Sequence, residues 1–64
     1  MTKYLINNVE TTKEYFFERL EEQVQLKAQD NVDKIVDLES EINDNLEMFG
    51  DYTINGIYFK IVES

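Results

Sequence analysis

The stretch from residue 30 to residue 49 constrains the fold more than any other part of the chain. Read as a helix at about 100° per residue, it gathers six apolar side chains into an arc of about 120°, the width of a core-facing stripe. These residues are Val32, Ile35, Leu38, Ile42, Leu46 and Phe49. Gly50 follows them and suits the left-handed position that ends many helices. The segment therefore predicts an amphipathic helix whose apolar side joins the core.

The opposite side of this predicted helix is acidic. Five carboxylates, three or four residues apart, fall within an arc of about 80°. They are Asp30, Asp33, Asp37, Glu41 and Asp44, and we call this set the acidic ridge. The helix would thus support the core and present a row of negative charges to water.

Residues 12–28 predict an earlier helix. Its apolar stripe, with spacings of three and four residues, has Phe16 at its edge. The stripe consists of Phe17, Leu20, Val24 and Ala28. Thr11 and Glu14 fit a capping box, in which the hydroxyl and the carboxylate each accept a backbone N–H of the first turn.

A polar connection separates the two predicted helices. Residues 27–31 interrupt the apolar stripe and offer Asp30 or Asn31 as a helix cap. We therefore expect two helices joined by a tight turn. One long helix is the alternative, because neither Gly nor Pro intervenes.

The last part of the chain predicts a β-hairpin. Asn55-Gly56 lies between alternating β-forming residues, which is the strongest short-range signature of a two-residue turn. That turn would pair Ile54 with Ile57 and would give the hairpin one apolar face. The face would contain Tyr52, Ile54, Ile57, Phe59 and Ile61.

A short strand at the start of the chain completes the predicted sheet. Residues 2–6 are rich in β-forming side chains, and Asn7-Asn8 can form a second two-residue turn into a strand stub. We expect this strand to join an edge of the later hairpin, since an isolated hairpin is barely stable. The fold class is α+β: a single domain over residues 1–64, β(β)ααββ, with two amphipathic helices packed on a small antiparallel sheet.

Composition excludes several classes of function. The chain has no Cys and no His, so zinc held by these residues and triads that use them are excluded. Residues 30–35 do not fit a calcium-binding EF-hand loop, because Val32 and Lys34 occupy the third and fifth positions, which need oxygen donors, and Ile35 occupies the sixth, which needs Gly. Acid/base catalysis needs carboxylates in an enclosed site, whereas the carboxylates of the acidic ridge project from the polar side of a helix. We expect no metal, no cofactor and no catalysis.

The net charge of −8 disfavours direct binding to nucleic acid or to an anionic membrane. No apolar run approaches the length of a membrane span, and the first residues lack the apolar core of a signal peptide. The expected location is therefore the cytoplasm.

The acidic ridge predicts an interaction surface. Residues three or four apart on a helix are about 4.5 to 6 Å apart along its axis, close to the phosphate spacing of DNA. A basic groove that binds phosphates would accept such a row, so the ridge predicts a mimic of DNA that binds a protein partner. Glu18 and Glu22 extend this prediction to the first helix. The alternative is that the carboxylates only keep the chain in solution.

Tyr58 is a further candidate contact residue. It lies with Val62 on the outer face of the predicted hairpin, and Tyr is favoured at contact surfaces. Partial burial against its neighbours is the competing interpretation. If both residues are exposed, a partner or a second copy of the chain would cover them, which predicts a possible homodimeric structural or adaptor module.

Two stretches resemble known proteins. Residues 3–8, followed by Thr12-Lys13 and Phe16-Phe17, resemble the opening of small acidic phage proteins. Residues 53–63 are similar to a hairpin of the prophage-encoded anti-CRISPR family that inhibits Cas9. The resemblance implies a phage or mobile-element origin and a role in blocking host machinery such as a CRISPR nuclease. For a phage-encoded protein the expected location is the host cytoplasm. It transfers no binding residues to this chain.

Overall fold

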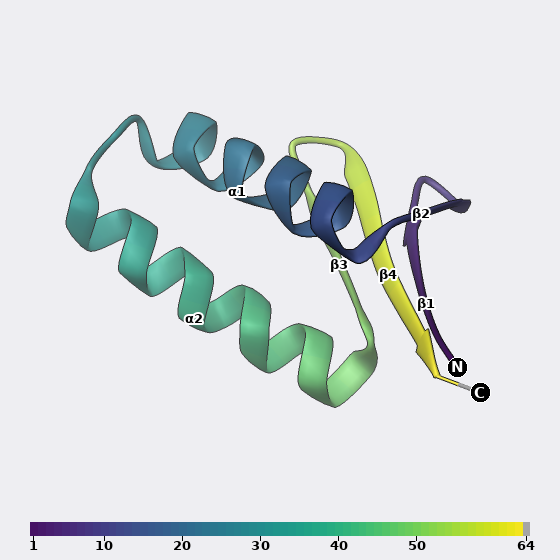
Figure 1. The fold of residues 1–64 in the computed structure, drawn as a ribbon. Coiled ribbons are helices and arrows are strands. Elements are labelled where there is room, and N and C mark those ends of the chain that lie inside the picture. Colours follow the sequence, from purple (N-terminus) through teal and green to yellow (C-terminus); the bar gives the residue numbers. More distant parts are fainter. Residues whose placement is uncertain (64) are drawn as a thin grey trace.

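Two helices cover one face of a four-stranded antiparallel sheet in the computed structural model, which describes residues 1–63 (Figure 1). The elements follow the predicted order. They are β1 (Thr2–Ile6), β2 (Val9–Thr11), α1 (Lys13–Ala28), α2 (Val32–Phe49), β3 (Asp51–Ile54) and β4 (Ile57–Glu63). The strand order is β2-β1-β4-β3, so β1 joins the hairpin at the free edge of β4. The predicted α+β fold is confirmed.

Both hairpins turn at the predicted residues, and the second has the predicted register. Asn7 and Asn8 have φ of 51° and 68°, and they place Ile6 opposite Val9. In the second hairpin, φ is 51° at Asn55 and 77° at Gly56, and Ile54 lies opposite Ile57. All four central residues thus have the positive φ that a two-residue turn between right-twisted strands requires. The two hairpins are joined where β1 pairs with β4 over five residue pairs.

The start of α1 differs from the prediction. Thr12, not Thr11, is the N-cap, and its Oγ1 accepts the N–H of Tyr15 at 3.1 Å. Thr11 instead lies opposite Tyr4 at the end of β2. The predicted capping box was therefore wrong by one residue, because strand pairing at Thr11 holds the chain extended for one position longer.

The connection between the helices is a tight turn, as expected. Gln29 and Asp30 have φ of 53° and 61°, in the left-handed region. Asn31 is the N-cap of α2, and its Oδ1 accepts the N–H of Lys34 at 3.2 Å. At the other end, Gly50 has φ of 77° and its N–H donates to the carbonyl of Leu46. Two separate helices are confirmed.

The core lies between the helices and the covered face of the sheet. Phe16 and Phe59 are fully buried, with ring centroids 5.4 Å apart in an edge-to-face arrangement. The other buried members of the core cluster are Leu20, Val24, Ile42, Leu46 and Ile54. The predicted apolar face of the hairpin is confirmed, since its remaining residues pack against this cluster.

Phe16 and Phe17 have exchanged the roles that the sequence pattern predicted. Phe16 is fully buried, whereas Phe17 is 39% exposed and leans on Phe16 and Tyr4 at the margin of the core. The sheet decides this, because it lies beneath the side of α1 that carries Phe16 and Gln23. The Nδ2 of Asn55 in the β3–β4 turn donates to Gln23 Oε1 at 3.0 Å.

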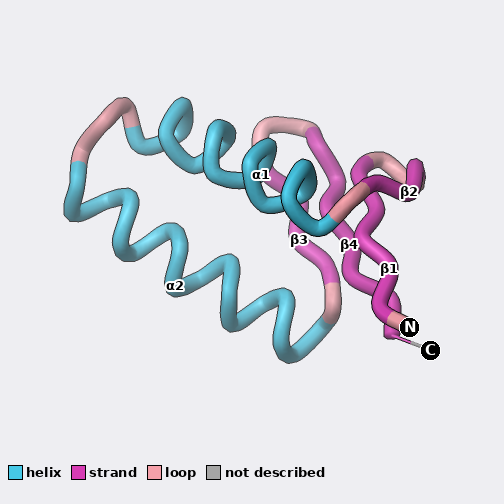
Figure 2. The backbone as a smooth tube through the Cα atoms, viewed as in Figure 1, coloured by secondary structure: helices cyan, strands magenta, loops and turns pink. Residues whose placement is uncertain are grey.

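The helix pair extends beyond the sheet. Figure 2 shows the loop that joins α1 to α2 at the end of the molecule farthest from the strands, and the long dimension is 35 Å against 20 and 19 Å for the others. Val32 is therefore 71% exposed, because no strand lies beneath the first turn of α2. Phe49 is 67% exposed at the other end of the helix. The prediction that both belong to the core was wrong.

Candidate functional site

The acidic ridge is an exposed row along α2. Asp33, Asp37, Glu41 and Asp44 all lie on the helix with exposed side chains. Asp30 is also exposed but belongs to the turn before the helix, with left-handed backbone. From Asp33 to Asp44 the row covers about 16 Å of helix axis. Because α2 is a regular helix capped at both ends, the four helical carboxylates are held at a fixed spacing.

No carboxylate of the acidic ridge forms an ion pair within residues 1–63. Within residues 1–63, the ion pair that the structure contains joins Arg19 and Glu22, with Nη1 and Oε2 2.8 Å apart. Lys34 lies on α2 with an exposed side chain that reaches no carboxylate within ion-pair distance in this part of the chain. The ridge carboxylates are therefore exposed and unpaired in this part of the chain, with Lys34 as the cation beside them, three residues before Asp37.

Negative charge is concentrated in the helical layer. Residues 13–49 carry eleven of the fourteen acidic side chains and four of the six basic ones. Net charge in this layer is therefore −7 of the total −8. Such segregation gives the molecule a strongly negative side and a nearly neutral side, which orients it in the field of a basic partner.

Glu41 lies at the margin of the ridge nearest the sheet. Partial burial raises the pKa of the Tyr52 hydroxyl, and the negative charge of Glu41 raises it further. Tyr52 belongs to β3, over which α2 packs. A partner that occupies the ridge at Glu41 would therefore also approach the outer edge of β3.

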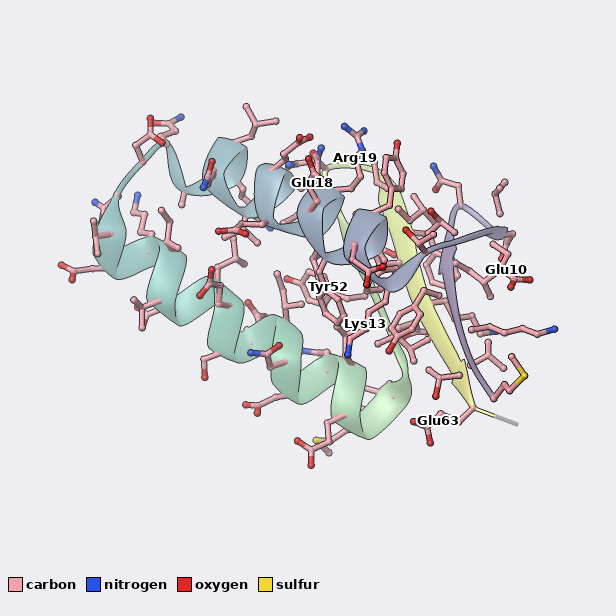
Figure 3. The ribbon with its side chains drawn as sticks, in the orientation of Figure 1. Glu10, Lys13, Glu18, Arg19, Tyr52 and Glu63 are labelled. Carbon is pink, nitrogen blue, oxygen red and sulfur yellow. The ribbon has the colours of Figure 1, made fainter. Side chains whose placement is uncertain are left out.

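Glu18 and Glu22 form a separate acidic surface. On α1 they are about 100° or more around the helix axis from Phe17, Leu20 and Val24, which face α2. Figure 3 shows Arg19, the partner of Glu22, projecting from the side of α1 that is turned away from α2. The structure therefore does not bring Glu18 and Glu22 next to the ridge.

Tyr58 lies on the face of the sheet that the helices leave uncovered. Its side chain is half-buried, and its hydroxyl donates to Asp51 Oδ2 at 2.8 Å. The backbone N–H of Tyr58 donates to Asn7 Oδ1 at 3.0 Å, which ties the β4 strand to the first turn. Leu5 and Val62 are half-buried on the same face. Lys60 lies on this face too, between Tyr58 and Val62 along β4 and opposite Leu5. We call Leu5, Tyr58 and Val62 the outer sheet patch.

The hydrogen bond to Asp51 raises the pKa of Tyr58, and partial burial and the charge of Asp51 act in the same direction. A folded pKa above the unfolded value of about 10 means that the folded state holds this proton more tightly. The associated stability is present below pH 10 and is lost as the pH rises through 10 toward the folded pKa.

We expect Asp51→Ala to lower the pKa of Tyr58, because the acceptor and its charge are both removed. Ultraviolet titration of tyrosinate should show one group fewer titrating above the ordinary tyrosine range. Tyr58→Phe identifies the group, because it removes the same step from the titration curve. An unchanged curve in Asp51→Ala would contradict this account of the contact.

Sequence reasoning missed two glutamates that the fold brings together. Glu21 and Glu39 lie on α1 and α2, on opposite sides of a hollow between the helices. Each lies on the flank of an apolar stripe, one position after Leu20 and one after Leu38. That position was readable from the sequence, but their proximity depends on how the two helices pack.

The described residues contain no group of three acidic side chains placed to hold a metal ion. Neither helix in residues 1–63 has the length and apolarity needed to cross a membrane.

No family model matches this chain, and comparison with curated proteins and with solved structures gives no significant match.

Proposed function

We propose that this protein is a non-catalytic inhibitor that binds a nucleic-acid-handling partner, such as a CRISPR nuclease or another defence nuclease, by placing its acidic ridge in the partner's basic groove. The observation that carries the proposal is the exposed row of ridge carboxylates on α2, unpaired within the described part of the chain. Its axial spacing of about 4.5 to 6 Å fits a groove shaped for phosphates.

The rigid helix also supports this function. A row of carboxylates on a capped helix loses little conformational entropy when it binds, because its backbone is already ordered. The concentration of negative charge in the helical layer would speed the encounter with a basic groove. The resemblance of residues 53–63 to an anti-CRISPR hairpin favours a defence nuclease as the partner.

Charge variants test the ridge directly. We expect Asp37→Asn/Asp44→Asn to weaken binding to the partner by about tenfold or more, since each removed charge loses an interaction with a basic side chain. Guide-loaded Cas9 is the first probe, measured by competition with duplex DNA at low and at high salt. Wild-type binding should weaken steeply with salt, because exposed charges are screened beyond about 8 Å at physiological ionic strength.

The matched control is Glu10→Gln/Glu18→Gln. This variant also removes two charges, but one lies on β2 and the other on α1, both exposed and away from the ridge. It should bind nearly as well as wild type. Equal weakening by both variants, or binding that salt does not change, would count against the ridge as the contact surface.

The outer sheet patch favours a second candidate function, a homo-oligomeric structural or adaptor module. Leu5, Tyr58 and Val62 lie half-exposed on a sheet face that no helix covers (Figure 1). That face belongs to the nearly neutral side of the molecule, so two copies could meet there without bringing their acidic helices together. Sedimentation of the purified protein separates the two functions: a concentration-dependent dimer favours the module, and a monomer favours the inhibitor.

A further inference from the structure

A groove runs between α1 and α2, on a flank of α2 different from the acidic ridge. Its floor is apolar and consists of Leu20, Val24 and Ile42. Phe17 and Glu21 form the wall on α1, and Glu39 forms the wall on α2. The hollow has a volume of about 190 Å³, which is below the 300 to 1,000 Å³ of pockets for drug-sized ligands. A hollow of this size can receive one or two side chains.

The groove continues toward the end of the sheet. Phe17 and Asn43 line this hollow and also a second one, which reaches Ile61 and Glu63 on β4. In the other direction along α2, toward its first turn, Val36 lies three residues before Glu39 and on the same flank of the helix. The groove is therefore longer than a single side-chain pocket.

Exposed apolar side chains border this groove. Phe17 is 39% exposed, Val36 is 59% exposed and Val32 is 71% exposed. Val32, Val36, Glu39 and Asn43 are spaced three or four residues apart, so they form one stripe along α2. Covering this stripe and Phe17 with another apolar surface would remove from water the side chains that the helix overhang leaves exposed.

Every charged side chain that lines the two hollows is a glutamate. These residues are Glu21, Glu39, Glu47 and Glu63. None of them takes part in an ion pair within residues 1–63. Figure 3 shows Lys13 on the side of α1 that faces α2, but this residue lines neither hollow. The groove thus combines an apolar floor with a rim of glutamates that form no ion pair within residues 1–63.

We propose that this groove binds a basic amphipathic helix of a partner protein. An apolar channel between two antiparallel helices accepts a third helix, whose side chains at positions i, i+3, i+4 and i+7 fill it. Lysines and arginines beside those positions would meet the four glutamates of the rim. A second copy of this chain fits poorly, because it would add another charge of −8 to the same acidic rim.

This proposal does not rest on the proposed function, since no residue of the acidic ridge lines either hollow. The probe is a synthetic helix of about 14 residues, four turns, with leucines at i, i+4, i+7 and i+11 and lysines or arginines beside them. A scrambled peptide of the same composition has the same charge without an apolar stripe. Fluorescence anisotropy measures the affinity, and amide chemical shifts locate the bound peptide on the full chain.

We expect the amphipathic peptide to bind at least about tenfold more tightly than the scrambled one and to shift the amides of Val24, Val36 and Asn43. Glu21→Gln/Glu39→Gln should weaken its binding by about tenfold. The matched variant Asp33→Asn/Asp37→Asn removes the same charge from the ridge and should change the affinity less than about twofold. Nuclease binding tests the ridge and peptide binding tests the groove. Either proposal can therefore fail while the other stands.

Three results would overturn the proposal. Absence of binding by the amphipathic peptide would do so, and so would equal binding of the scrambled peptide. Equal weakening by the groove variant and the ridge variant would show attraction by bulk charge alone. Glu21 and Glu39 are exposed, so we expect their substitution to leave the fold intact. Far-ultraviolet circular dichroism of each variant checks this.

Discussion

Phe16→Ala is expected to lower the free energy of unfolding by about 3 to 5 kcal/mol, the range for truncating a buried phenylalanine. Phe16 is fully buried and packs against Tyr4, Phe17 and Phe59, with ring centroids 5.1 to 5.4 Å apart. A domain of 64 residues has a total stability of about 3 to 10 kcal/mol. The variant should therefore be largely unfolded or close to it, as measured by urea denaturation followed by circular dichroism.

Phe17→Ala is the matched control for this prediction. Phe17 is the next residue in the chain, but it is 39% exposed and contributes mainly its edge contacts with Phe16 and Tyr4. We expect a loss of about 1 to 2 kcal/mol. Phe16→Leu, which keeps most of the side-chain volume, provides a measurable value if Phe16→Ala does not fold. An equal loss for both alanine variants would contradict the burial that separates the two phenylalanines.

Gly50→Ala is expected to cost about 2 to 3 kcal/mol, because two effects add at this position. Gly50 ends α2 with φ of 77°, a conformation that a residue with a Cβ atom adopts only with strain. A Cβ atom there would also lie 3.2 Å from the carbonyl oxygen of Ile61 on β4. The N–H of Ile61 donates to the carbonyl of Gly50 at 2.7 Å, and this hydrogen bond holds Gly50 close to β4. Thermal unfolding of the variant measures the effect.

Gly56→Ala separates the two causes. Gly56 also has φ of 77°, but no atom lies within 4 Å of a Cβ atom built there. Only the conformational strain remains, so we expect a loss of about 1 kcal/mol. If Gly56→Ala cost as much as Gly50→Ala, the close approach of Gly50 to β4 would have no energetic weight.

The two candidate surfaces use different sides of α2. The ridge is purely charged and exposed, so its interactions should depend strongly on salt. The groove combines apolar side chains with glutamates, so its interactions should retain an apolar component at high salt. A single partner with a basic groove and a basic amphipathic helix could engage both sides, and the paired variants of Asp37 and Glu39 distinguish their contributions.

The local features of this fold were predictable from the sequence. Asn55-Gly56 specified the turn and therefore the register of β3 and β4, because a two-residue loop leaves one way to pair the strands. Gly50 predicted the end of α2 through its left-handed backbone, and the start was predicted to within one residue, since Asp30 and Asn31 both suited the N-cap that Asn31 occupies. The exposure of the ridge was predictable for the same reason: the apolar stripe of α2 determines which side of the helix faces water.

The placement of neighbouring side chains depended on the tertiary packing. Phe16 and Phe17 are about 100° apart on α1, so helical periodicity allows either one to be the buried residue. The sheet beneath α1 selects Phe16. Val32 fits the apolar stripe but is exposed, because α2 extends past the strands and nothing covers its first turn. Glu21 and Glu39 face one groove only because α1 and α2 fold back on each other, a relation between distant residues that neither helix specifies alone.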